Sequence, residues 1–180
     1  MNVDGLKLTS YFGERKRCGR RFLADALMDL YGRQQLTTSI MLRGAEGFGL
    51  KHHLRSDHSL TLSEDLPAVA VAVDTSERIE AVVDQIAELG PGLITLERAR
   101  LLTGDITPVA LAEEAYDATK LTVYVGRQER VYRVPAVVAV CDLLHRRGVA
   151  GASVLLGVDG TRHGARERGA SPTSRAGRRS

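Results

Sequence analysis

The chain of 180 residues is 43% hydrophobic and 26% charged, an ordinary composition for one large or two small globular domains. It contains no apolar run of the roughly 18 to 20 residues that a membrane span needs, and its first residues lack the apolar core of a secretory signal. We therefore expect a cytoplasmic protein. Its two cysteines, Cys18 and Cys141, are read as reduced thiols because they form no CxxC pair.

The net charge of +3 comes from the end of the chain. Residues 162–180 carry six arginines and one acidic residue among Gly, Ser and Ala, whereas the preceding part is slightly acidic. So polar a segment cannot bury enough surface to offset its ordering entropy, and we predict a disordered basic tail. A nearly neutral folded part argues against nucleic acid as the main partner.

The first elements alternate between strand and helix patterns. Residues 6–12 (LKLTSYF) alternate as a half-buried strand, and residues 22–31 place their apolar side chains on one helical stripe. Residues 37–43 (TTSIMLR) predict a second strand, a glycine-rich segment its exit loop, and Pro67–Val73 a short buried strand.

A second helix and a last strand complete the first domain. The helix is expected after Ser76, a candidate N-cap, and Gly90-Pro91-Gly92 ends it. The last strand is expected near Ala99–Leu102. The order β-α-β-β-α-β predicts an α+β, ferredoxin-like domain over residues 1–104, with sheet order 4-1-3-2.

An internal repeat follows a linker over residues 105–119, in which a short helix is expected near residues 109–116. Residues 7–47 and 120–160 align without gaps at an offset of 113 and share 14 identities in 41 positions. Unrelated sequences would match at about one position in fifteen. The chain therefore holds a partial second copy over residues 120–161.

The second copy predicts a strand at Leu121–Val125, a helix over about Pro135–Arg147 and a strand at Ala152–Leu156. After Gly160 it lacks the third strand, second helix and fourth strand, so its two strands would have no neighbour between them. Either another segment or subunit fills the gap, or the half-domain is marginally folded. A truncated or frame-shifted C-terminus would have the same appearance.

The motifs LKLTSYFGERKR, SIMLRGAEGFG, HHLRSD and LSEDLPAVAVAVD together resemble the family called domain of unknown function 190, of the PII-like superfamily. The resemblance covers residues 5–103 and about 118–160. It implies a ferredoxin-like domain that assembles as a trimer, without catalytic activity. It also implies regulation linked to a membrane transporter such as a fluoride exporter. PII proteins bind adenine nucleotides between subunits with a loop after the second strand, which corresponds here to residues 45–61.

This resemblance and the glycine spacing give a candidate site for a small anion or a nucleotide, with no cofactor required. Backbone N–H groups of the glycine-rich loop would form an anion-binding nest, and nearby cations would add charge. The alternative is that Gly44 and Gly47, which recur in the second copy, serve backbone geometry with positive φ. The candidate residues are Tyr11, Gly13, Glu14, Arg43, Gly44, Glu46, Gly47, Gly49, Lys51 and Arg55.

Three other features have competing interpretations. His52, His53 and His58 are read as solvated, with a metal site as the alternative function, although adjacent histidines on an extended segment point to opposite faces. Glu64 and Asp65 are read as turn or cap residues because no catalytic partner accompanies them. The basic stretch 14–21 is read as solvated, or as an anion site at the start of the first helix.

Overall fold

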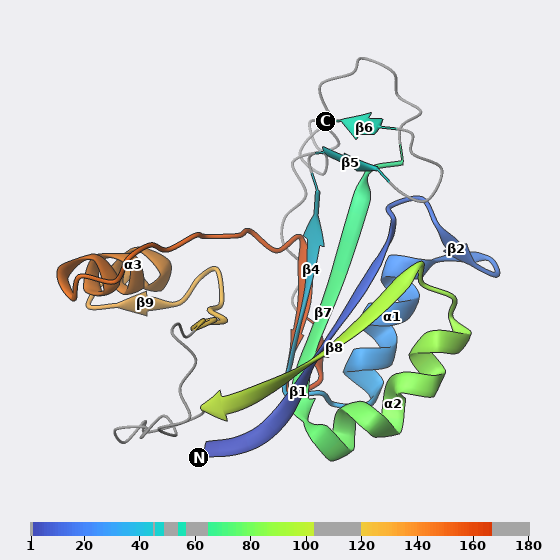
Figure 1. The fold of residues 1–180 in the computed structure, drawn as a ribbon, viewed down its shortest axis with the longest axis horizontal. Coiled ribbons are helices and arrows are strands. Elements are labelled where there is room, and N and C mark those ends of the chain that lie inside the picture. The colour runs from blue at the N-terminus through green and yellow to red at the C-terminus, as the bar shows by residue number, and fades with distance from the viewer. Residues whose placement is uncertain (1, 45, 49–53, 57–64, 103–119, 167–180) are drawn as a thin grey trace, which may run out of the picture. The chain divides into compact units, whose positions relative to one another are not determined.

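The computed structural model describes residues 2–44, 46–48, 54–56, 65–102 and 120–166 (Figure 1). The chain divides into two compact units. The first unit comprises residues 1–107 and 157–180, and the second unit comprises residues 108–156.

An antiparallel sheet forms the first unit. Its four long strands are β1 (Asn2–Gly13), β4 (Thr38–Arg43), β7 (Pro67–Thr75) and β8 (Leu93–Leu102). They lie in the order β4-β7-β1-β8, and all their pairings are antiparallel. This is the predicted 4-1-3-2 order, so the ferredoxin-like fold is confirmed.

Two helices, α1 (Leu23–Arg33) and α2 (Ser76–Glu88), cover the same face of this sheet (Figure 1). The core between them is lined by Leu8 and Phe12 of β1 and by the buried stripe of α1. On β7 the side chains that face the helices are alanines, whose small size lets the helices approach the sheet closely. Burying each larger side chain contributes about 1.5 to 3 kcal/mol to folding.

Two boundaries differ from the sequence prediction. The last strand begins at Leu93 rather than near Ala99, because ten residues of β8 pair with β1 from Tyr11 back to Asn2. Its charged residues are tolerated because β8 is an edge strand of the described sheet. The prediction of Ser76 as N-cap is wrong: Thr75 occupies that position, without a side-chain cap, and Ser76 is the first helical residue.

Short hairpins flank the main elements. Strands β2 (Arg17–Cys18) and β3 (Arg21–Phe22) pair just before α1, and β5 (Glu46–Phe48) pairs with β6 (Leu54–Ser56). The second unit repeats the first of these hairpins as β9 (Arg130–Val131) and β10 (Val134–Pro135). β9 lies 113 residues after β2 and β10 lies 113 residues after β3, which is the offset of the sequence repeat.

The second unit confirms its predicted helix but neither of its predicted strands. The helix is α3 (Ala136–Arg146). Residues 121–125 and 152–156 have no strand structure, so both strand predictions are wrong for this single chain. A strand requires a hydrogen-bonded neighbour, and the described part of the second unit offers neither segment one. The predicted helix near residues 109–116 lies outside the described residues.

The start of the predicted tail belongs to the sheet. Strand β11 (Asp159–Arg162) pairs with β4, and β12 (Ala165–Arg166) pairs with β11. His163 and Gly164, with φ of 46° and 80°, form the two-residue turn with positive φ at both positions that hairpins favour. Residues 162–166 are therefore not disordered as predicted, because β4 provides an open edge. Residues 167–180 lie outside the described residues.

A buried tyrosine makes the core sensitive to alkaline pH. Burial raises the pKa of Tyr31 to about 12, from an ordinary value of 10.0. The neutral hydroxyl is therefore favoured by folding, and this stabilisation is complete below pH 10 and disappears as the pH rises towards 12. We expect Tyr31→Phe to raise the midpoint of alkaline unfolding, measured by far-UV circular dichroism. An unchanged midpoint would show that another group controls this transition.

Candidate functional site

The predicted anion-site residues fall into three groups. Tyr11 and Gly13 lie at the end of β1, Arg43 ends β4, and Glu14 and Gly44 follow these two strands. Glu46 and Gly47 lie in β5 and Arg55 in β6, where Gly47 pairs with Arg55. Gly49 and Lys51 lie outside the described residues.

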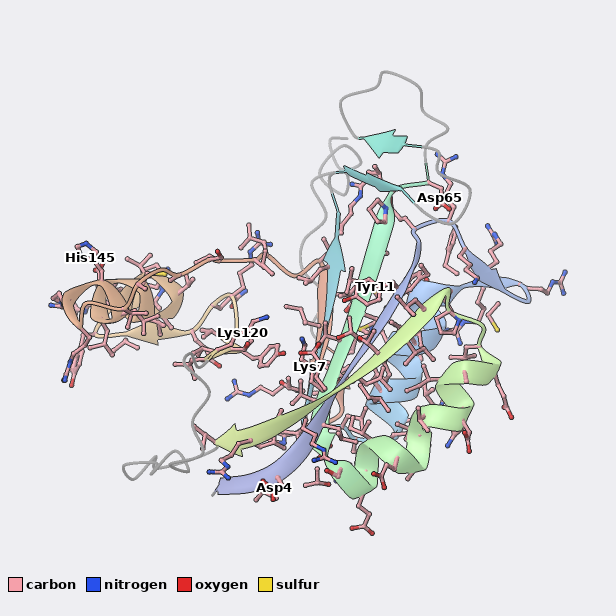
Figure 2. The ribbon with its side chains drawn as sticks, in the orientation of Figure 1. Asp4, Lys7, Tyr11, Asp65, Lys120 and His145 are labelled. Atoms are coloured by element: carbon pink, nitrogen blue, oxygen red, sulfur yellow. The ribbon has the colours of Figure 1, made fainter. Side chains whose placement is uncertain are left out.

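The ends of β1, β4 and β7 meet at one junction. The Arg43 Nε donates a hydrogen bond to Oε2 of Glu14 over 3.1 Å, which joins the end of β4 to the end of β1. Asp65, two residues before β7 (Figure 2), accepts a hydrogen bond of 2.6 Å from the Arg15 amide. These contacts fasten the residues before and after segment 45–64 to the same turn.

Backbone hydrogen bonds complete the junction. The amide of Glu14 donates to the Leu66 carbonyl over 2.8 Å, and the amide of Gly44 donates to the Pro67 carbonyl over 2.7 Å. Both amides are therefore already used by the protein. Neither amide is free to contribute to an anion-binding nest.

The recurring glycines are required by close packing rather than by positive φ. None of Gly44, Gly157 and Gly160 is in the left-handed region, which corrects the backbone-geometry prediction for Gly44 and its counterpart. A Cβ on Gly44 would lie 2.6 Å from the Pro67 side chain, and one on Gly157 would lie 2.7 Å from Ile40. Such distances leave no room for a side chain. At Gly13, a Cβ would collide with the Asp65 carboxylate.

Tyr11 does not contact this junction through its side chain in any described interaction. Its register partners are Val69 on β7 and Leu93 on β8, and its side chain is 41% exposed. Its carbonyl accepts a hydrogen bond from the Gly92 amide, which fixes the turn before β8. Tyr11 is thus placed on the sheet, away from the helices.

The predicted metal ligands His52, His53 and His58 lie outside the described residues. Within the described ranges, no group of three His, Cys, Asp or Glu side chains could hold a metal ion. Both cysteines are free. In the same described ranges, no helix is both long enough and apolar enough to cross a bilayer.

The basic stretch 14–21 forms the β2–β3 hairpin rather than the first turn of α1. The Arg17 guanidinium lies 4.3 Å from the centroid of the Phe22 ring, and Arg21 forms an ion pair with Asp29. The first turn of α1 carries Asp25, which already suits the helix dipole. The argument for a bound anion at this helix start therefore does not hold.

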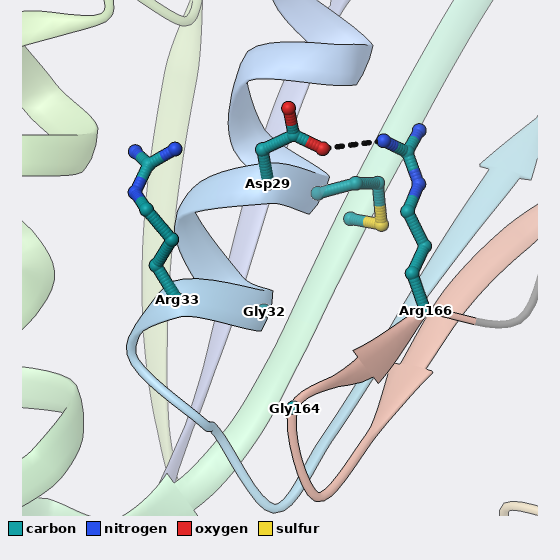
Figure 3. Close-up of a pocket in the computed structure, with 6 residues that line it drawn as sticks. Asp29, Gly32, Arg33, Gly164 and Arg166 are labelled. Atoms are coloured by element: carbon teal, nitrogen blue, oxygen red, sulfur yellow. Dashed lines mark hydrogen bonds and ion pairs between the residues drawn. The ribbon is translucent and has the colours of Figure 1, made fainter.

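An arginine cluster that the sequence interpretation missed fastens the β11–β12 hairpin to α1. Arg166 binds Asp159 and Asp29, each at 2.5 Å, and Asp25 at 2.8 Å. Figure 3 shows the ion pair between Arg166 and Asp29. Both side chains line an open hollow of about 280 Å³. The wall of this hollow also includes Met28, Gly32, Arg33 and Gly164.

The two arginines and the carboxylates of this cluster keep one another charged. The hydrogen bond from Arg21 and the charge of Arg166 hold the pKa of Asp29 below its ordinary value of 3.8. Hydrogen bonds to Asp159 raise the pKa of Arg166, so the guanidinium stays charged. With Nε, Nη1 and Nη2 all bound to carboxylates, Arg166 is a structural clamp and not a ligand-binding cation.

Comparisons with known proteins give a family. The model of the family DUF190, described as an uncharacterised ACR, matches residues 5–101 and again residues 118–176. The second match extends past Gly160, where the sequence repeat was expected to end, and includes the β11–β12 hairpin. No curated protein matches the chain.

Two solved structures show partial likeness. Both are CPII, a nitrogen regulatory PII-like protein from Thiomonas intermedia K12, and each alignment covers 56% of this chain and 91% of that one. The structure with ADP, AMP and bicarbonate has 16% identity and a TM-score of 0.40. The structure with ADP and bicarbonate has 13% identity and a TM-score of 0.37. On the family match over both segments, the chain belongs to the DUF190 family and carries one full and one partial copy of its domain.

Proposed function

We propose that the protein is a non-enzymatic, PII-like regulator that binds a small anion or a nucleotide at the end of β4. The observation that supports this is the junction at which Arg43 and Asp65 fasten both ends of segment 45–64 to the turn after β1. In this proposal, N–H groups and cations of the loop join the exposed Arg43 guanidinium in holding the ligand. Arg43 has a half-exposed side chain, so a ligand can reach it.

The ligand would replace Glu14 on Arg43. An Arg–phosphate pair is frequently bidentate and stronger than a neutral hydrogen bond, whereas Glu14 bonds Nε in an exposed pair that contributes little. Lys51 and Arg55 would add charge from the loop. Loss of the Arg43–Glu14 hydrogen bond would disconnect the end of β4 from the turn after β1, which would couple ligand binding to the conformation of the loop.

The proposal includes a cytoplasmic protein that trimerises through its first unit and whose ligand-dependent loop meets a membrane transporter, such as a fluoride exporter. The support is the family and the sheet face opposite α1 and α2, where the apolar residues Ile40, Leu42 and Val69 lie on neighbouring strands. Sedimentation velocity measures the number of chains directly. A particle whose number of chains is not a multiple of three would contradict the trimer, and an absence of co-purification with the transporter would contradict the partner.

Binding is tested by isothermal titration with ADP, AMP, bicarbonate and inorganic phosphate, each separately. We expect Arg43→Ala to weaken binding of the probe that the wild type binds by about 10- to 100-fold, as for the loss of a hydrogen bond to a charged group. We expect Glu14→Gln to keep or strengthen binding, because it removes the competing carboxylate.

Arg98→Ala is the matched control, since Arg98 is an exposed arginine on β8. It should bind like the wild type. Equal affinity of Arg43→Ala and wild type, or no binding of any of the four probes to the wild type, would contradict the proposed site.

A further inference from the structure

The second unit exposes apolar positions whose counterparts in the first unit are buried. At the repeat offset of 113, Leu121 and Val123 correspond to Leu8 and Ser10, and Val154 corresponds to Met41. Leu121, Val123 and Val154 are 62%, 49% and 51% exposed, whereas their counterparts are 0%, 0% and 4% exposed. The second copy has thus kept the core-facing positions of a sheet but lacks the sheet.

The helix of the second unit has the same imbalance. In α1, the stripe Leu27, Met28, Leu30 and Tyr31 is buried against the sheet. In α3, Leu143, the counterpart of Leu30, is 49% exposed, and Ala136 is its only buried residue. An apolar helical stripe of this kind requires a sheet face to cover it.

The first unit shows what is missing. There β1 and β4 are not neighbours, because β7 lies between them, and β8 pairs with the other edge of β1. One β-α-β half contains β1 and β4, and the other contains β7 and β8. One strand of each half therefore lies between the two strands of the other half. Segments 121–125 and 152–156 correspond to the two strands of one half, and they can form a sheet only when a second half supplies the strand between them.

The first copy cannot be that second half. Strand β7 already pairs on both sides, with β1 and β4, and β8 already pairs with β1. A second chain of the same sequence does carry an unpaired β-α-β half, in equal amount. Because the two halves of a ferredoxin-like sheet are related by an approximate two-fold axis, two identical halves satisfy the same pairing.

We infer that two chains complete each other through their second units. Segments 121–125 of the two chains pair antiparallel at the centre, and each segment 152–156 pairs with the outer edge of the other chain's segment 121–125. The two copies of α3 then cover one face, over the apolar side of both central strands. The result is a four-stranded, ferredoxin-like domain built from two halves.

The sequence of the central segment suits this self-pairing. With the two-fold axis at Val123, Leu121 faces Val125 and Thr122 faces Tyr124 across the strands, which are favourable β-branched, apolar and aromatic pairs. Lys120 faces Gly126 of the other chain, so the two lysines lie at opposite ends of the ladder and do not repel each other.

Disulfide cross-linking tests this pairing in the full-length chain, and its result does not depend on how the first copies assemble. Val123→Cys is introduced into a Cys18→Ser, Cys141→Ser background and oxidised mildly. Because directly opposite residues have Cβ atoms about 4.5 to 5.5 Å apart, we expect most chains to run as disulfide-linked dimers on a non-reducing denaturing gel. Val149→Cys in the same background is the control, because Val149 is also 49% exposed but lies outside both segments.

Hydrogen exchange provides the second measurement. In the wild type, amides of residues 121–125 and 152–156 should exchange at least tenfold more slowly than in Val123→Asp, while β1 and β7 are unchanged between the two. Equal cross-linking of Val123→Cys and Val149→Cys, or fast exchange of both segments in the wild type, would overturn the inference. Neither result bears on the ligand site at Arg43, which lies in the first unit.

Discussion

Replacing Asp74 with alanine is expected to lower the free energy of unfolding by about 3 kcal/mol, because two backbone amides lose a charged acceptor. Asp74 is 1% exposed at the end of β7. Its Oδ2 accepts a hydrogen bond of 2.7 Å from the Thr37 amide, and its Oδ1 accepts one of 2.7 Å from the Thr75 amide. Arg78 Nε lies 3.2 Å from Oδ2.

This one carboxylate joins the start of β4 to the connection between β7 and α2. Without it, the Thr37 amide at the entry to β4 loses its acceptor, and the Arg78 guanidinium keeps only its hydrogen bonds to the Gln34 and Gln35 carbonyls among its described contacts. Asp74→Asn retains one side-chain oxygen and should lose about half as much, and Asp84→Ala, at an exposed position of α2, should stay within about 0.5 kcal/mol of wild type. Urea denaturation measures all three; an Asp74→Ala variant as stable as Asp84→Ala would contradict the role.

The elements of the first copy could be predicted because each has a local pattern. Alternation in residues 6–12 and the apolar stripe of residues 22–31 are imposed by their own burial, and β1 and α1 contain most of these residues. Strand β8 was placed too late because its exposed edge position allows Glu97 and Arg98, which interrupt the alternation.

The second copy shows where local patterns stop being sufficient. Residues 121–125 have a strand pattern as clear as that of β1, but a strand exists only with a partner, and the partner is not adjacent in sequence. The glycines were interpreted through φ, whereas their actual constraint is the approach of Pro67 or Ile40 from another strand. Such constraints appear only once the strand pairing is known.

The Arg166 cluster had no sequence signal for the same reason. Arg166 stands 137 and 141 residues from Asp29 and Asp25, inside a segment whose composition indicates a disordered tail. The cluster exists because β11 adds to the open edge of β4, which brings β12 against α1. The Asp25–Asp29 spacing, one helical turn apart, is common and specifies no partner.

The second large effect is expected from Arg166→Met, which should release the β11–β12 hairpin. Asp159, itself mostly buried, loses its cation and keeps the Gly160 amide as a donor, while Asp29 keeps its ion pair with Arg21. Removing one partner of such an ion pair costs about 3 kcal/mol. This corresponds to about a 100-fold increase in the equilibrium constant for local unfolding of the hairpin. The amides of Val158 and His163, which donate to β4 and to Thr37, should exchange about 100-fold faster.

Acid should also release the β11–β12 hairpin in the wild type. The pH of this release shows whether protonation of Asp29 causes it. Because the folded pKa of Asp29 is depressed, its contribution is complete above pH 3.8 and is lost as the pH falls through the folded value. Arg100→Met, which breaks a 4.0 Å pair with the exposed Asp4, should leave the two amides within threefold of wild type. If Arg166→Met behaves like Arg100→Met, the hairpin is held by its ladder to β4 alone, and the arginine cluster is a consequence of docking rather than its cause.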